Sequence, residues 1–502
     1  MRVEKPLLLG IGASLRNGRW GIGSQSLITA IENSSSKEKL YQFLAEQSDL
    51  HIENFLDAGR QENKSFDEIY RNLKKNKGDK GLSNSEVALA AALWAAYQEG
   101  VAIDHLSLAE HFLSTGKIVK ADEFKEKLLK ADGLIISGPV YFGDRGSLAH
   151  SFIDFIRQDK TLQQQLEGKI YGGLAVGAKR NGGQETTLIY QMWDMLQLNF
   201  LTVGNDSETT SQYGGTGHAG DVGSMHKDDY GLETSMGTGR RMSELIKRLA
   251  IKKELKDKPR ILFLILQDQK SEALSKLQKL LSYFEADMEA TVLDVASRTV
   301  YRCIACDICP TTIDVDSIYR CIIKANDDDM EAMHHTLLHH DAIVPVTLSR
   351  KESVDRLSNY QNFLERSRYL RRGDYVFSNQ LVTSLTYEEL DVHENYAMRI
   401  MTSMLRHHTV MFKPLIAYLQ GDEWVNQSTI EEGFGLFLQQ TKRMATARLS
   451  AIEGEGSITR YNPMGYLLSK EKDNEDEKES ARDKRIAERH QHQLHEAQER
   501  LQ

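Results

Sequence analysis

The feature that most constrains the fold is an alternation of short apolar runs with amphipathic stretches. The runs "PLLLGIGA" (6–13), "ADGLIIS" (131–137) and "IYGGLAVGA" (170–178) are typical of strands buried on both faces. Apolar residues recur at helical spacing in "SLAHSFIDFIRQ" and "ETTLIYQMWDMLQ", which follow the second and third runs. Strands that alternate with helices in this way predict a doubly wound parallel α/β sheet.

The same alternation starts again in the second half of the chain. "RILFLILQ" (260–267) and "DAIVPV" (341–346) are predicted strands, and "EALSKLQKLLSYF" is a predicted helix. A shift of 209 positions (341 minus 132, and 394 minus 185) places Asp132 on Asp341 and Glu185 on Glu394. It also lays "QETTLIYQMWDML" over "HENYAMRIMTSML" without a gap. We infer a diverged duplication of one α/β domain.

A length of 502 residues allows two or three domains. We expect a first domain at 1–250, with a helical insertion at about 35–100 and a glycine-rich loop at about 204–239. A second domain is expected at 258–465. The tail at 466–502 is highly charged and has almost no apolar residues, so it is predicted to be a solvated helix or disordered.

Charge and hydropathy exclude two classes of partner. A net charge of −9 argues against a dedicated nucleic-acid binder, which normally carries a basic face. No window approaches the roughly 18 apolar residues of a membrane span. The first apolar run is short and has no small-residue cleavage site, so it predicts a strand and not a signal peptide. We expect a cytoplasmic protein whose thiols stay reduced.

Three glycine-rich loops follow predicted strands of the first half: "GIGASLRNGRWGIGSQS" (10–26), "SGPVYFGDRGS" (137–147) and "VGAKRNGGQETT" (176–187). The first precedes a helix, so its backbone N–H groups suit a phosphate. Glycines in the other two let a flat ring approach the backbone, and Tyr141 and Phe142 offer aromatic surface. Ligands bind beyond the carboxyl ends of such strands, so the three loops together predict FMN.

These motifs resemble the NADPH-dependent FMN reductase and iron–sulfur flavoprotein families, which have a flavodoxin-like fold. The resemblance covers 1–250 apart from the insertion, and it implies an NAD(P)H-dependent FMN oxidoreductase. Four segments carry the FMN-binding residues: the phosphate loop, the Pro-Val-Tyr loop, the Arg-x-Gly-Gly-Gln-Glu loop and "SQYGGTG". The implied residues are Ser14, Arg16, Asn17, Ser24, Pro139, Val140, Tyr141, Phe142, Gly143, Arg180, Gly182, Gly183, Gln184, Glu185, Tyr213 and Gly214.

The phosphate loop departs from the families in one respect. Its "RNGRWGIG" link between Arg16 and the helix is longer than usual, so the choice between Ser24 and Ser26 stays open. No catalytic acid or base is identified, and reduction of a flavin does not need one.

All four cysteines lie in one window, "CIACDIC" (303–309) and Cys321. Thiolates at Cys303, Cys306 and Cys309 with a fourth at Cys321 suit a 4Fe–4S cluster. Structural zinc usually takes two separated pairs, and zinc or redox-switching thiols are the alternatives. The segment through "CIIKANDDDM" also resembles the iron–sulfur flavoprotein family, although the gap before Cys321 is longer here.

The second half lacks the flavin motifs. "LILQDQKSEAL" has no glycine and no Ser-x-Arg, and "SNQLVTSLTYEELDVHEN" has no double glycine. We predict a degenerate domain that keeps the fold and the metal. His335 and His339, four positions apart, are either a metal-binding pair or ordinary histidines of a helix surface or hydrogen-bonded core. A cluster of four arginines has two interpretations: it binds an anionic substrate or a partner, or it is a salt-bridged helix end. These residues are Arg366, Arg368, Arg371 and Arg372.

The expected function is electron transfer within a homo-oligomer. FMN would take electrons from NAD(P)H, and the cluster would pass them singly to a small-molecule or protein acceptor. A second interpretation reverses the flow, from a ferredoxin to a small substrate. A third is a non-enzymatic redox sensor, or a scaffold stabilised by zinc.

Overall fold

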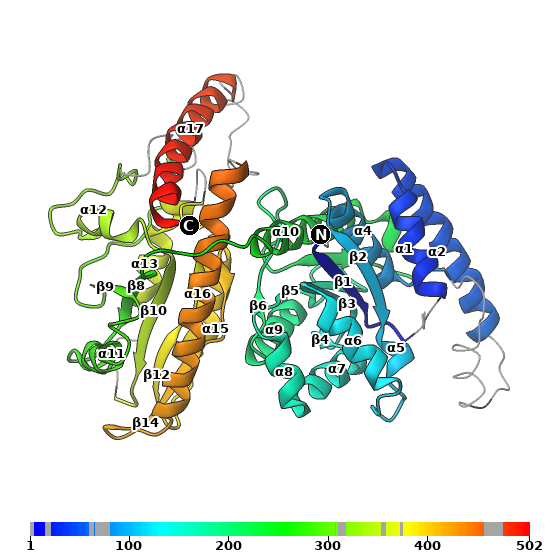
Figure 1. The fold of residues 1–502 in the computed structure, drawn as a ribbon, viewed down its shortest axis with the longest axis horizontal. Helices are drawn as coiled ribbons and strands as arrows, with labels where there is room; N and C mark the ends of the chain where they lie inside the picture. The colour runs from blue at the N-terminus through cyan, green and yellow to red at the C-terminus, as the bar shows by residue number, and fades with distance from the viewer. Residues whose placement is uncertain are drawn as a thin grey trace. The chain divides into compact units, whose positions relative to one another are not determined.

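The computed structural model describes residues 5–15, 22–59, 65, 81–306, 308–309, 318–352, 358–371, 375–455 and 475–502. The chain forms two compact units, Met1–Lys247 and Arg248–Gln502, and each contains its own parallel strands (Figure 1). Among the described residues, no helix has the length and apolar character needed to cross a membrane.

Counted along the chain and not by their labels, the five parallel strands of the first unit lie side by side in the order 2-1-3-4-5. They are β2 (Ala102–Ser107), β1 (Leu7–Gly12), β3 (Gly133–Tyr141), β5 (Ile170–Gly177) and a fifth, broken strand, β6 (Leu201–Thr202) and β7 (Gly215–His218). The short β4 (Asp144–Arg145) pairs antiparallel with the end of β3. This is the strand order of flavodoxin-like folds, and it confirms the predicted α/β class.

Helices cover both faces of these strands. A Cβ added at Gly172 would face Met242, whereas one at Gly173 would face Leu188. Successive strand residues point to opposite faces, so the helices that carry Met242 and Leu188 lie on opposite sides. The helices are α1 (Ile22–Asn33), α2 (Lys37–Gly59), α4 (Asn84–Gln98), α5 (Leu108–His111), α6 (Ala121–Lys130), α7 (Ser147–Gln158), α8 (Lys160–Leu166), α9 (Gln184–Gln197), η1 (Met225–Lys227) and α10 (Asp229–Leu249).

The prediction of a helical insertion at about 35–100 is wrong for the C-terminal part of that range. Helix α4 is almost entirely buried and packs on β1, β3 and β5. A Cβ at Gly10 would lie 2.7 Å from Leu93 Cδ1, and Ser137 Oγ donates to Ser85 O at 2.6 Å. Helix α4 is therefore a core crossover helix, and its alanines allow this close approach to the sheet.

The predicted loop at about 204–239 ends earlier than expected, because α10 begins at Asp229. A side chain at Gly239 would collide with the carbonyl oxygen of Ala92 in α4. The glycine therefore allows two helix backbones to cross closely and does not mark a loop here.

The parallel strands of the second unit have the same 2-1-3-4-5 order. They are β9 (Glu289–Asp294), β8 (Arg260–Gln267), β10 (Ala342–Ser349), the broken strand β11 (Leu381–Val382) and β12 (Leu385–Glu389), and the broken strand β13 (Val410–Met411) and β14 (Leu415–Gln420). Strand β15 (Glu423–Trp424) pairs antiparallel with β14. The helices are α11 (Glu272–Ser282), α12 (Met330–Met333), η2 (His335–Leu337), α13 (Ser358–Arg366), α14 (Arg368–Arg371), α15 (Tyr396–Leu405), α16 (Gln427–Glu455) and α17 (Glu475–Arg500).

The aspartates that the 209-residue shift aligns make equivalent contacts in the two units. Asp132 Oδ2 accepts from the N–H of Leu7 at 2.8 Å, and the N–H of Asp132 donates back to Leu7 O at 2.8 Å. Asp341 Oδ2 accepts from the N–H of Arg260 at 2.9 Å, and its own N–H donates to Arg260 O at 2.8 Å. The contacts support the predicted duplication, which stays a prediction.

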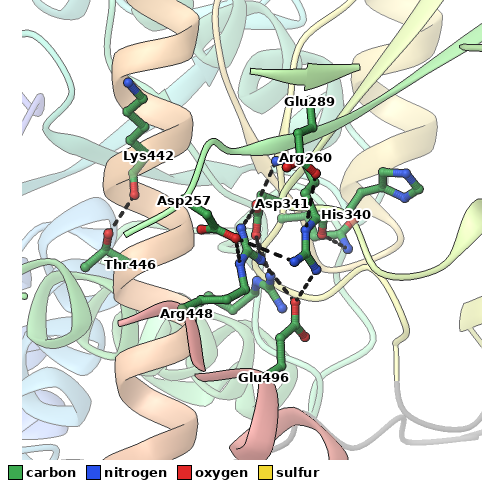
Figure 2. Close-up of polar contacts among 11 residues, drawn as sticks. Asp257, Arg260, Glu289, His340, Asp341, Lys442, Thr446, Arg448 and Glu496 are labelled. Atoms are coloured by element: carbon green, nitrogen blue, oxygen red, sulfur yellow. Dashed lines mark hydrogen bonds and ion pairs between the residues drawn. The ribbon is translucent and has the colours of Figure 1, made fainter. Parts of the chain in front are cut away.

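The charged tail buries its last turn, contrary to the prediction of a solvated or disordered segment. In α17, Ala497 packs with Leu501 and with Leu449 and Ile452 of α16. Arg500 donates to the fully buried Asp341 through Nη1 (3.1 Å) and Nη2 (2.7 Å). Figure 2 shows Asp341 among charged neighbours from several elements, which include Asp257, Arg260, Arg448 and Glu496.

Burial alone raises the pKa of the Asp341 carboxyl, but the hydrogen bond from Arg500 and the charges of Arg448 and Arg500 bring that pKa below its ordinary value. Removing one partner of a buried ion pair costs about 3–5 kcal/mol, because the other charge is left uncompensated. Arg448 Nη2 also donates to Asp341 Oδ1, at 2.9 Å, so Arg500→Met leaves the carboxylate with one of its two arginines. The substitution should therefore lower the free energy of unfolding of the second unit by less than that full amount in urea titrations at pH 7.

The contribution of a lowered carboxyl pKa is present above the unfolded-state pKa and is lost as the pH falls through the folded-state value. The difference between wild type and Arg500→Met should therefore shrink in acid. Lys484→Met removes the same charge from an exposed position of α17 and is the control. Equal losses in the two variants would contradict the role of Arg500.

A second prediction concerns His407, which is buried beside Ser367 with an Nε2–Oγ distance of 3.4 Å. Burial, with a smaller effect from the charge of Arg371, lowers the pKa of His407 to about 3. The unfolded chain binds a proton below about pH 6.5, where the folded chain does not. The urea midpoint of the second unit should therefore fall between pH 7 and pH 5. His407→Gln should flatten that slope, and His495→Gln, at an exposed site, should leave it unchanged.

Candidate functional site

The carboxyl ends of four neighbouring strands form the platform of the site in the first unit. Gly12 of β1 lies opposite Ser137 of β3, and Pro139 of β3 lies opposite Val176 of β5. His218 of β7 lies opposite Gly177 of β5. The loops that leave these strands therefore start at one edge of the sheet. The strand order reverses between β1 and β3, the position where ligands bind in such sheets.

The loop from β1 to α1 is described at its two ends. Ser14 and Ser24 are buried, and Ser24 Oγ lies 3.1 Å from His105 Nδ1 on β2. Ser26 is exposed. Arg16 and Asn17 lie outside the described residues. Ser24 stands in the first turn of α1, and the N-terminal end of a helix is a favourable place for an anion. His105 belongs to none of the motifs that the sequence analysis singled out.

The hairpin of β3 and β4 carries the Pro-Val-Tyr loop. Pro139 and Val140 continue β3, and Tyr141 is exposed. Phe142 is fully exposed and has a φ of 53°, a left-handed conformation that is uncommon outside glycine. The hairpin is held to α9 by an ion pair between Arg145 and Asp194. An aromatic pair is thus presented to solvent from a fixed turn.

The loop from β5 to α9 contacts this hairpin. A Cβ at Gly183 would lie 2.8 Å from Gly143 Cα, and Gly183 has a φ of 104°. Gln184 Nε2 donates to Lys179 O at 2.8 Å and to Gly217 O at 3.1 Å, which fixes the loop to β7. The contact at Gly183 requires the absence of a side chain there.

A cavity of about 450 Å³ opens beside this loop. Its volume lies within the range of small-molecule and cofactor sites. The residues that line it are Arg180, Asn181, Gly183, Gln184, Glu185, Thr186, Thr216 and Tyr230. Tyr213 is buried, and a side chain at Gly214 would collide with Gly173 O.

Arg180 is the positively charged residue among those that line the cavity, and three contacts hold its side chain. It forms an ion pair with Asp228, donates to Thr216 O at 3.3 Å and lies 5.0 Å from the ring centre of Tyr230. Asp228 also accepts from the N–H of His218 at 2.6 Å. The sequence did not identify Thr216, Asp228 or Tyr230. Asp228 directly precedes α10 and Tyr230 lies in its first turn, and neither belongs to a motif that the sequence analysis singled out.

The four cysteines of the second unit line one small cavity together with Glu365, Arg366 and Arg368. All four are free thiols; Cys321 is buried and the other three are half-buried. The cavity holds about 10 Å³, room for about one water molecule. Among the described residues, no group of three or more His, Cys, Asp or Glu side chains is placed to hold a metal ion. The donor chemistry fits a thiolate-bound centre, and the segment must spread to admit one.

The thiol segment already contains contacts typical of a sulfur site. Ala305, with a φ of 51°, donates its N–H to Cys303 Sγ at 3.4 Å, and Arg368 Nη1 lies 3.8 Å from the same sulfur. Hydrogen bonds to sulfur are among the interactions that tune thiolate-bound clusters.

The phosphate position of the second unit is occupied by a side chain. Asp268 follows β8, and its Oδ1 accepts from the N–H of Gln269 at 2.6 Å and of Ala273 at 2.8 Å. Its Oδ2 accepts from the N–H of Leu274 at 3.2 Å. The carboxylate therefore takes the place at the start of α11 that an anionic ligand would need.

The predicted helical pair of His335 and His339 is wrong. His335 lies in the single turn η2, whereas His339 has a φ of 65° and stacks near His492 with ring centres 5.4 Å apart. Of the four arginines, Arg366 and Arg368 line the thiol cavity, and Arg372 lies outside the described residues.

A family model described as NADPH-dependent FMN reductase matches residues 77–212. An iron–sulfur flavoprotein of Methanocaldococcus jannaschii is 36% identical over 177 residues, which cover 33% of this chain and 91% of that protein. An NAD(P)H dehydrogenase (quinone) of Caulobacter vibrioides is 32% identical over 130 residues, or 24% of this chain and 65% of that protein. The solved flavodoxin, WrbA-like protein of Agrobacterium tumefaciens aligns at 12% identity and a TM-score of 0.27, over 49% of this chain and 99% of its own.

A substitution at Gly183 tests the cavity. Gly183→Ala places a Cβ 2.8 Å from Gly143 in a left-handed conformation, so the two loops must separate. We expect loss of at least tenfold in FMN affinity, measured by quenching of flavin fluorescence, with little change in the unfolding of the second unit. Gly435→Ala, where a Cβ meets nothing within 4 Å, is the control. Unchanged affinity in Gly183→Ala would show that the flavin binds elsewhere.

Proposed function

The chain belongs to the NADPH-dependent FMN reductase and iron–sulfur flavoprotein family, and from this we propose that it carries electrons from NAD(P)H, through FMN in the first unit, to a 4Fe–4S cluster in the second. It is an NAD(P)H-dependent FMN oxidoreductase. The observation that carries the cluster assignment is that all four thiols line one cavity.

The loops of the first unit support the following FMN site. Ser14, Ser24 and the first turn of α1 would hold the phosphate, together with Arg16 and Asn17 of the same loop. The isoalloxazine ring would lie against the 450 Å³ cavity, between the two remaining loops. Their contributing residues are Pro139, Val140, Tyr141, Phe142, Gly143, Arg180, Gly182, Gly183, Gln184 and Glu185, with Tyr213 and Gly214 behind them.

The chain's own groups would orient the ring and shape its electrostatics. Gln184 is held by two backbone carbonyls, so it fixes the loop that the ring would approach. Arg180 supplies a positive charge at a fixed position between Asp228 and Tyr230. FMN supplies the chemistry, because it accepts two electrons as hydride and releases them one at a time.

The contrast between the units supports the division of cofactors. In the second unit, Asp268 fills the place at the start of α11 that corresponds to the proposed phosphate position at the start of α1. A phosphate there would meet a carboxylate at hydrogen-bond distance from the same N–H groups. Cys303, Cys306, Cys309 and Cys321 are therefore proposed as ligands of a centre that needs no nucleotide.

The electron acceptor is proposed by chemical class only. A small-molecule or protein partner would take electrons from the cluster, and a homo-oligomer is the proposed assembly. The four free thiols support a reducing compartment such as the cytoplasm.

Anaerobic purification tests the proposal. We expect FMN at one per chain on acid release, and iron and sulfide in the proportions of one 4Fe–4S cluster per chain. A broad absorption band that dithionite bleaches should accompany them. Stoichiometric zinc without iron would support a zinc scaffold instead.

Cys306→Ser should remove the band and most of the iron while FMN stays bound, because it deletes one ligand of the cavity and leaves the first unit unchanged. Ile304→Ser changes an exposed residue of the same segment and should keep the iron. Full iron content in Cys306→Ser would show that the cluster is not held by this set.

A further inference from the structure

We propose that Arg366 and Arg368 are positioning residues of the four-cysteine site. Arg366 ties the two ends of the cysteine segment together, and Arg368 sets a positive charge against Cys303. Together they make the site favour the more reduced, more negative state of the centre it holds. This inference rests on the proposed function of the thiol site.

Arg366 holds the cysteine segment from both sides. Its side chain is fully buried, and Nη1 donates to Tyr301 O at 3.0 Å, two residues before Cys303. Nη2 donates to Ile323 O at 3.4 Å, two residues after Cys321, and to the Tyr319 hydroxyl. Asp328 accepts from both Nη1 (2.6 Å) and Nη2 (3.2 Å). One guanidinium thus joins the start and end of the loop that carries the thiols.

Asp328 completes this anchor. Its carboxylate also accepts from the N–H of Tyr301 and of Met330, each at 3.0 Å. Burial raises the pKa of Asp328, but the hydrogen bond from Arg366 and the two backbone N–H bonds lower that pKa overall. The pair is therefore charged and self-compensated, so Arg366 contributes geometry more than net charge.

Arg368 contributes the charge. Its Nη1 lies 3.8 Å from Cys303 Sγ. Glu365 also lines the cavity, but its Oε1 accepts from Gln361 Nε2 at 3.3 Å on the exposed side of α13, where solvent screens it. Among the described residues, Arg368 thus places a positive charge directly beside a cysteine sulfur.

A fixed cation stabilises an anionic centre in proportion to the centre's charge. Four thiolates make the cluster negative, and one-electron reduction adds a further negative charge without breaking a bond. In the test that electron comes from dithionite through a dye mediator. Arg368 therefore stabilises the reduced form more than the oxidised form and raises the midpoint potential.

Potentiometric titration of the anaerobic protein tests the charge. Arg368→Gln should weaken the one-electron reduction about tenfold, a shift of about 59 mV to more negative potential. Arg368→Lys should restore most of it. Glu365→Gln removes a negative charge that solvent screens, so it should shift the potential in the opposite direction and by much less. Arg371→Gln removes the same charge from α14 outside the cavity and should have no effect.

Alkylation of the metal-free protein gives a readout that does not need iron. The ratio of the iodoacetate rate to the iodoacetamide rate at Cys303, read by mass spectrometry, compares an anionic with a neutral reagent. The Cys303 thiolate attacks both reagents and displaces iodide from each, so the ratio reports the local field and not the thiol's own ionisation. Arg368→Gln should lower this ratio several-fold, and Arg371→Gln should not change it.

Hydrogen exchange tests the anchor. Arg366→Lys keeps the charge but cannot reach all of its acceptors, so amides of 301–306 and 318–328 should exchange at least tenfold faster while those of β8 stay protected. If exchange at this segment is unchanged, Arg366 does not position it.

The outcomes separate the two proposals. Wild-type protein without iron would defeat the proposed cluster, and the alkylation ratio would still decide the role of Arg368. If Arg368→Gln changes neither the alkylation ratio at Cys303 nor the midpoint potential, the inference about charge is overturned, whereas the proposed cluster is not.

Discussion

The parallel register between β1, β3 and β5 is the constraint on which the chemistry of the first unit depends. Because Gly12 aligns with Ser137 and Pro139 aligns with Val176, three loops begin at the same edge. A slip of one residue would turn every side chain of a strand to the opposite face. The register is held by packing against α4 and α10, where glycines of the sheet meet Leu93 and Met242 directly.

The second unit has the same strand order but presents different groups to a ligand. The carboxylate of Asp268 accepts from backbone N–H groups at the start of α11, the place that corresponds to the proposed phosphate position at the start of α1. The connection between β9 and β10 carries the thiols, and Arg366 secures it from α13. The same strand order thus supports two different candidate sites. Glycines leave room for a flat ring in the first unit, whereas a carboxylate and cysteine sulfurs stand in the second.

Local sequence predicted the parts of the fold whose burial is continuous. The runs at 6–13, 131–137 and 260–267 became β1, β3 and β8 because each is buried on both faces. The edge strands β2 and β9 were missed, because polar residues such as Asp104 and Glu289 interrupt their apolar runs.

Contacts between distant residues could not be predicted in this way. The buried end of α17 depends on Arg500 reaching Asp341, 159 positions away, and composition alone suggested a solvated tail. In the candidate sites, the glycine loops and the cysteines carried recognisable local patterns. His105, Asp228 and Tyr230 did not, because their roles depend on partners in other elements. Arg366 and Arg368 stood out as part of a basic cluster, but only the fold shows that they face the thiols.

The central claim is that FMN and the cluster are held by separate units of one chain. Low-temperature electron paramagnetic resonance of dithionite-reduced protein, recorded before and after FMN is stripped with mild chaotrope, tests it most directly. We expect the signal of a reduced 4Fe–4S cluster to survive removal of the flavin at full intensity, and FMN to rebind without any change in iron content. Loss of flavin and iron together, or the absence of any cluster signal, would contradict the account.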